Sequence, residues 1–147
     1  MSVLKSKRKE SKFEVFHNFY KLRKELTELV YRRFGYKGED TYKLWFINNE
    51  AQSVLKDLAD AQRYITIANS IYPNCLMECD ERRKHQDLAI GLLYDLLQEL
   101  QFVLEMLPYL DKNKYVRHSD IINKEIALLK GWRQSDNATR TKIRGNL

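Results

Sequence analysis

The chain has 147 residues, the size of one domain, and 44% of them are hydrophobic, enough to form a core. Five glycines and two prolines are too few for an all-β sandwich or a nucleotide-binding α/β sheet, so the composition predicts an all-α protein. Lysines and arginines number 26 against 20 acidic residues, and this excess favours a polyanionic partner.

Two segments with helical spacing of apolar residues occupy the first half of the chain. In the first segment, Ser11 and Glu14 fit a capping box, and apolar residues then recur every three or four positions until Gly35, a typical helix-ending residue. The second pattern runs over residues 44–72, and Pro73 ends it because proline cannot continue a helix. We expect a long helix in each segment.

Two further helical segments follow in the second half. Asp80 can cap the third segment, whose apolar stripe ends at Pro108, and the fourth starts between Asp111 and Ser119 and ends at Trp132. Four amphipathic helices with short connections predict an all-α, antiparallel, up-down-up-down four-helix bundle. We expect one domain over residues 1–147: a basic arm over 1–11, the bundle over 12–134, and a flexible basic tail over 135–147.

The excess positive charge lies at the two ends of the chain. Residues 1–12 hold five cations and one acid, as do residues 130–147, so the remainder is net negative. In a bundle of this topology both termini and the connection before the third helix lie at the same end. Arg82, Arg83 and Lys84 follow that connection and oppose the helix macrodipole, so helix stability does not explain them.

These basic elements predict a positively charged pole that binds nucleic acid, RNA or DNA; charges that are merely solvated are the alternative. The candidate nucleic-acid-binding residues are Lys5, Lys7, Arg8, Lys9, Lys12, Arg82, Arg83, Lys84, Lys130, Arg133, Arg140, Lys142 and Arg144.

Motifs for catalysis or cofactor binding are not found in the sequence. There is no glycine-rich phosphate loop and no paired-carboxylate pattern, and Cys75, Cys79 and His85 lack a zinc-site spacing. We expect no enzyme, no metal and no cofactor.

The start of the chain does not resemble a signal peptide, and no uncharged run reaches membrane-spanning length. We therefore expect a cytoplasmic protein with reduced cysteines.

Residues 65–72 are uncharged on every side of the second helix, and something must cover this surface. Either the neighbouring connection and the N-terminal arm fold over it, or a second subunit of a homo-oligomer packs on it. The candidate interface residues are Ile65, Ile67, Ile71 and Tyr72.

The segment Leu128-Leu-Lys-Gly-Trp132, at the end of a basic four-helix bundle, resembles a known family. That family includes the ribosomal-RNA intervening-sequence proteins and the accessory variability determinant of diversity-generating retroelements, and its last helix ends in an aliphatic turn followed by Gly-Gly-Trp. Here Lys130 replaces the first of these glycines. The resemblance implies a ring-forming homo-oligomer, a pentamer, that binds nucleic acid and a reverse transcriptase.

The sequence thus predicts a non-catalytic, nucleic-acid-binding accessory subunit that helps a reverse transcriptase use its RNA template. The alternative is a structural or adaptor bundle that binds another protein through Tyr36, Tyr42, Trp45 and Phe46, with basic ends that only keep it soluble.

Overall fold

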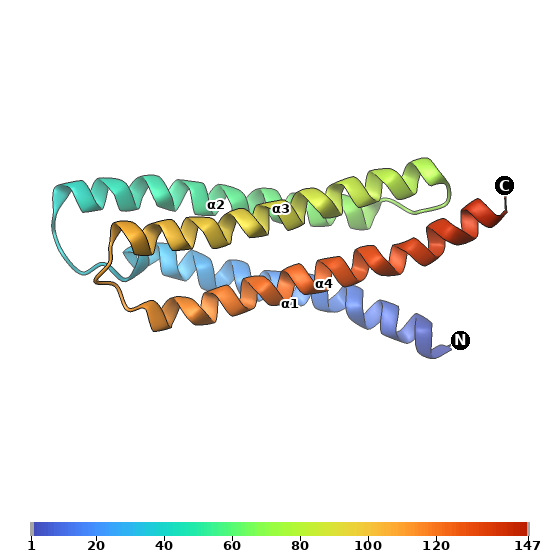
Figure 1. Ribbon diagram of the computed structural model, residues 1–147, viewed down its shortest axis with the longest axis horizontal. Coiled ribbons are helices and arrows are strands. Elements are labelled where there is room, and N and C mark those ends of the chain that lie inside the picture. Colours follow the sequence, from blue (N-terminus) through green and yellow to red (C-terminus); the bar gives the residue numbers. More distant parts are fainter. Residues whose placement is uncertain (1, 147) are drawn as a thin grey trace.

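The computed structural model describes residues 2–146, and their side chains from residue 14 onward. Within this range the chain forms four long helices and no strand, which confirms the predicted bundle (Figure 1). The helices are α1 (Ser2–Tyr31), α2 (Thr41–Ser70), α3 (Leu76–Met106) and α4 (Lys112–Gly145), and a short 3-10 turn, η1 (Arg33–Gly35), follows α1.

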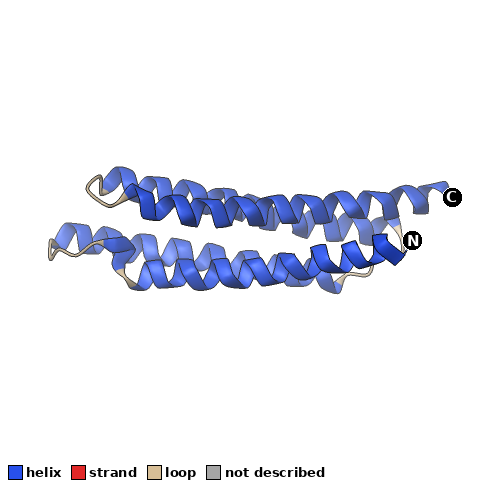
Figure 2. Cartoon of the chain, turned by 90° about the horizontal axis from the view of Figure 1, so that it is seen from below, coloured by secondary structure: helices blue, strands red, loops and turns tan. Residues whose placement is uncertain are grey.

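Consecutive helices run in opposite directions and pack side by side, and α4 returns to pack against α1 (Figure 1). Seen from below, the helices form two layers (Figure 2). The two ends of the chain and the α2–α3 connection lie at one end of the bundle, called here the terminal end. The α1–α2 and α3–α4 connections lie at the other, the far end. The predicted topology therefore holds.

The core consists of one apolar stripe from each helix, at the spacing of three, four or seven residues that puts side chains on one face. In α2, for example, Val54, Leu58, Ala61 and Ile65 are at most 1% exposed. Trp132, at the end of the α4 stripe, is 2% exposed, so the predicted packing of this ring is confirmed.

Aspartates begin two of the helices as N-caps. The Asp40 side chain accepts hydrogen bonds from the backbone amides of Tyr42 and Lys43, and Asp111 accepts one from Asn113. The α4 start thus lies inside the predicted interval. Two predicted starts are wrong: Ser11 lies within α1, and α3 begins at Leu76 rather than at a cap on Asp80.

The predicted flexible tail over 135–147 is wrong for residues 135–145, because α4 continues to Gly145. Its last turns lie against the first turns of α3 and make polar contacts there. Asp136 pairs with Arg82, Asn137 accepts a hydrogen bond from Arg83, and Arg140 pairs with Asp80. A helix held by polar contacts shows no apolar periodicity, which is why the sequence pattern did not reveal it.

The chain turns between α1 and α2 through three consecutive residues in the left-handed region. Their φ angles are 56° at Arg33, 58° at Phe34 and 97° at Gly35. Only glycine adopts this region without strain, so the surroundings must hold the other two residues there. Phe34 is 1% exposed, and its carbonyl oxygen accepts a hydrogen bond of 2.5 Å from the Tyr115 hydroxyl on α4.

Candidate nucleic-acid interface

A groove of about 510 Å³ lies at the terminal end, where α3 begins and α4 ends. Three arginines and one carboxylate line it, together with the polar side chains of Asn137 and Thr141. The charged residues are Asp80, Arg83, Arg140 and Arg144. The last turns of α4 place two of these cations on a regular helix and not on a loose tail.

The three arginines of the groove differ in how far their charge is compensated. Arg140 forms an ion pair with Asp80, which neutralises one positive charge. Arg83 donates a hydrogen bond of 3.1 Å to the Asn137 side chain, a neutral group, and keeps its full charge. The Arg144 side chain has no hydrogen bond or ion pair among the described residues. The groove therefore offers an excess of positive charge.

The prediction that Arg82 binds nucleic acid is wrong, because its side chain is buried and only 6% exposed. Its Nε and Nη2 donate to the two oxygens of Asp136 at 2.7 and 3.2 Å, and its Nη1 donates to the Ile71 carbonyl oxygen at 3.1 Å. The guanidinium also lies over the Trp132 ring, 4.9 Å from its centroid. Arg82 therefore holds three parts of the fold together and is not available to a phosphate.

Lys130 and Arg133 lie on the α3–α4 flank rather than in the groove. Lys130 donates a hydrogen bond of 2.6 Å to the Tyr94 hydroxyl, and Arg133 pairs with Asp87 at 2.7 Å. Lys130 is about four helical turns before the end of α4. The predicted grouping of these two residues at the pole is wrong, because α4 runs farther than the sequence pattern indicated.

The remaining predicted cations divide into two groups. Lys84 and Lys142 are exposed near the groove residues of their helices, α3 and α4. The five N-terminal cations lie in the first turns of α1, but their side chains are outside the described part; they are Lys5, Lys7, Arg8, Lys9 and Lys12.

The residues of the predicted subunit interface differ in how far they are exposed. Ile65 is 1% exposed and belongs to the bundle's own core, so its assignment to an interface is wrong. Ile67 and Ile71 are half-buried, and Tyr72 is 76% exposed. Of these four residues, Tyr72 presents the most surface to a second copy.

The predicted adaptor aromatics also differ in exposure. Tyr36 is 8% exposed, and its hydroxyl accepts a hydrogen bond from the Asp40 amide, so it is not free to bind a protein. Phe46 is half-buried and packs edge-on against Phe102. Only Tyr42 and Trp45, 86% and 67% exposed, are open to a partner.

Several buried carboxyl groups lie outside the predicted sites. Glu125 is fully buried and accepts a hydrogen bond of 3.2 Å from the Asn18 amide, and burial raises its pKa to about 8. Between α2 and α3, burial and then a hydrogen bond with Glu99 raise the pKa of Glu50 to about 8. Glu125 could have been suspected from the sequence, because it lies next to Ile126 and three residues after Ile122.

No family model, curated protein or solved structure matches this chain. Within residues 2–146 no cluster of three or more His, Cys, Asp or Glu side chains is arranged to hold a metal ion. In the same range, none of the helices combines the length and apolar character required to cross a bilayer.

Proposed function

We propose that this protein is a cytoplasmic, non-catalytic subunit that binds nucleic acid through the groove between the start of α3 and the end of α4. The observation that carries the proposal is the gathering of Arg83, Arg140 and Arg144 around one groove with a single carboxylate. Arginine suits phosphate because its planar fork donates two parallel hydrogen bonds to phosphate oxygens.

The charge balance within the groove supports a polyanion as the ligand. Asp80 compensates the charge of Arg140. The charges of Arg83 on α3 and Arg144 on α4 have no acidic partner among the described residues. Lys84 and Lys142 are exposed on the same two helices and extend the positive surface. Such contacts to phosphates position nucleic acid without reading its sequence, so we expect binding of RNA and of DNA.

The family resemblance extends the proposal to a partner. It implies that the nucleic acid is the RNA template of a reverse transcriptase, which the protein would bind as a homo-oligomer, a pentamer. The helical end of α4 supports this accessory role, because it would present Arg140 and Arg144 to a bound strand from a regular helix.

Fluorescence anisotropy with a labelled single-stranded RNA, repeated at several salt concentrations, tests the proposal. The Arg83→Ala/Arg144→Ala variant should bind more weakly, and the slope of log K against log salt should fall by roughly two. Lys24→Ala/Lys56→Ala, which removes two exposed cations from α1 and α2, is the matched control and should retain the full slope. Equal slopes for the two variants would contradict the assignment of the groove.

The adaptor alternative makes a different prediction for the same protein. Tyr42 and Trp45 are exposed at the start of α2, toward the far end. If they form the functional surface, the protein should bind RNA without a steep salt dependence, and Tyr42→Ala/Trp45→Ala should abolish binding of its protein partner. The groove variant should then leave that complex intact.

A further inference from the structure

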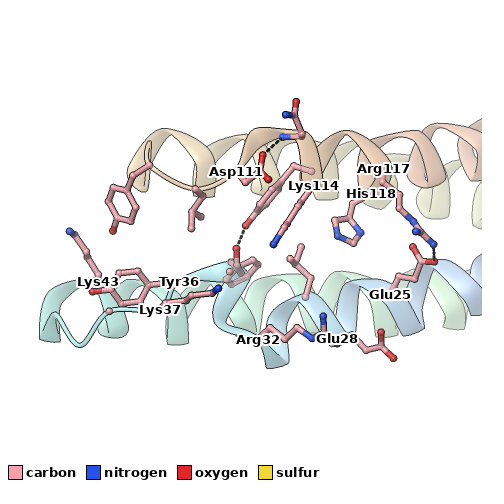
Figure 3. Close-up of a pocket in the computed structure, with 18 residues that line it drawn as sticks. Glu25, Glu28, Arg32, Tyr36, Lys37, Lys43, Asp111, Lys114, Arg117 and His118 are labelled. Carbon is pink, nitrogen blue, oxygen red and sulfur yellow. Dashed lines mark hydrogen bonds and ion pairs between the residues drawn. The ribbon is translucent and has the colours of Figure 1, made fainter.

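A cavity of about 1080 Å³ opens between α1 and α4 at the far end of the bundle (Figure 3). Its walls come from the end of α1, η1, the α1–α2 connection, the start of α2, the α3–α4 connection and the first turns of α4. The volume is that of a small-molecule site. The groove assigned above lies at the opposite end, so this cavity is a separate feature of the molecule.

Apolar and aromatic side chains cover part of the cavity wall. Phe34 and Tyr115 are buried there and fixed to one another through the hydrogen bond from the Tyr115 hydroxyl to the Phe34 carbonyl oxygen. Leu29 adds an aliphatic surface from α1. The strained turn at Arg33 and Phe34 holds this wall in place. Phe34 and Tyr115 are almost fully covered, so the apolar surface that an occupant meets comes from Leu29 and from the exposed ring of Tyr109.

Three of the cations that line the same cavity have no acidic or hydrogen-bonding partner in the described part of the chain. The side chains of Arg32, Lys37 and Lys114 line it, and none has a hydrogen bond or ion pair among the described residues (Figure 3). Two of the three carboxylates in the lining already have partners: Asp111 caps α4, and Glu25 pairs with Arg117 at 3.0 Å. Only Glu28 is exposed and unpaired within the described structure. The free charge is therefore predominantly positive.

Two buried polar atoms of the lining lack a hydrogen-bond partner in the described structure: Nδ1 of His118 and Oε2 of Glu25. Neither atom has accessible surface, so an occupant of the cavity does not bond to them, and the attraction for an anion comes from the exposed cations. His118 lies one helical turn after Lys114, and the two side chains project from the same side of α4 (Figure 3).

We infer that this cavity binds a small amphipathic organic anion, with its carboxylate or phosphate between Arg32, Lys37 and Lys114 and its apolar body against Leu29 and Tyr109. His118 lines the same cavity and lies beside Lys114, so its ring signals report on an occupant. Burial lowers the pKa of His118, so the ring is neutral at neutral pH and the positive charge of the site comes from the three cations. This inference does not rest on the proposed function.

Titration of the protein with decanoate, followed by NMR of the imidazole ¹⁵N signals, tests the site. Decanoate should bind saturably with one molecule per chain and shift the His118 signals while those of His17 and His85 stay in place. Lys37→Ala/Lys114→Ala should weaken binding more than tenfold. Both lysines are exposed, so this variant should fold normally. Lys84→Ala/Lys142→Ala, the matched control at the terminal end, should bind decanoate as the unmodified protein does.

Decyl phosphate and decylammonium separate charge recognition from simple hydrophobic binding. Decyl phosphate should compete with decanoate, and decylammonium should not. The inference is wrong if decylammonium binds equally well, if the lysine variants bind with equal affinity, or if the shifts fall on His85. RNA binding by Lys37→Ala/Lys114→Ala should be unchanged, so failure of this site and failure of the nucleic-acid groove give different results.

Discussion

Asp136, near the end of α4, holds the guanidinium of Arg82 on α3 in a bidentate ion pair, with N–O distances of 2.7 and 3.2 Å. The Asp136 oxygen that accepts from Arg82 Nε also accepts a hydrogen bond of 2.9 Å from Gln86. Because the same guanidinium bonds to the Ile71 carbonyl oxygen, the pair joins the α2–α3 connection, α3 and α4. This one carboxylate therefore links three segments of the chain at the terminal end.

Arg82→Ala should therefore destabilise the fold, although its neighbour Arg83 should be dispensable for stability. Removing one member of a buried ion pair leaves the other uncompensated and typically costs about 3 kcal/mol or more. Arg83→Ala removes an exposed hydrogen bond to Asn137 and should change the free energy of unfolding by less than about 0.5 kcal/mol. Urea unfolding of both variants measures the difference, and equal stabilities would contradict the structural role of Arg82.

Two truncations of α4, one that keeps Asp136 and one that removes it, should differ in their effect on the melting temperature. Removing residues 138–147 keeps the Arg82–Asp136 pair and should lower the melting temperature only slightly. Removing 136–147 deletes the carboxylate and should approach the effect of Trp132→Ala, for which loss of a buried ring costs about 3–5 kcal/mol. Similar melting temperatures for the two truncations would mean that Asp136 does not order this end.

The free energy of unfolding should fall as the pH rises from 5 to 8, and the buried carboxyl group of Glu125 is one cause. Burial raises the pKa of Glu125 to about 8 in the folded protein, well above the ordinary value of a glutamate, so the folded state keeps a proton that the unfolded state releases. The stabilisation is complete below the unfolded pKa and is lost as the pH rises toward 8, at about 1.4 kcal/mol per pH unit. Glu50 and Asp57, with raised pKa values, act in the same direction.

Glu125→Gln isolates the contribution of Glu125 to this pH dependence. Glutamine retains an oxygen that can accept the hydrogen bond from Asn18, and it has no proton to lose. The variant should be more stable than the unmodified protein at pH 8 and should show a shallower decline in denaturant midpoint between pH 5 and 8. A decline as steep as that of the unmodified protein would assign the effect to other groups.

Alanine should have opposite effects at two glycines of the chain. Gly35 has a φ of +97°, and an alanine there is strained, so Gly35→Ala should destabilise by more than about 1 kcal/mol. Gly91 lies inside α3, and a Cβ added there enters open space, so Gly91→Ala should stabilise by about 0.5–1 kcal/mol through helix propensity. Thermal melts of both variants compare them directly.

The proposed homo-oligomer should depend on Tyr72 and Ile67. Tyr72→Lys and Ile67→Lys should yield monomers with unchanged helicity, because a lysine buried in a subunit interface is unpaired and desolvated there. Ile65→Lys is not a suitable test, because Ile65 is in the core and the variant should unfold. Sedimentation velocity gives the answer, and a monomeric unmodified protein at micromolar concentration would end this proposal.

The sequence by itself determined the fold class, the four helices and their topology. The apolar residues of α2 recur at helical spacing, Asp40 and Asp111 precede helices as caps, and Pro73 and Pro108 fall outside them. These signals are local, since they depend on backbone geometry and on which side chains leave water. They located Trp132 in the core and the basic residues near the chain ends.

Only the tertiary structure decided what individual charged residues do. In the sequence, Arg82 and Arg83 are two adjacent arginines, but consecutive helical positions point in different directions, so one is buried against Trp132 and Asp136 and the other lines the groove. The helical end of α4 and the far-end cavity likewise depend on residues distant in the chain. Polar contacts and cavities between helices follow from packing geometry, which apolar periodicity does not encode.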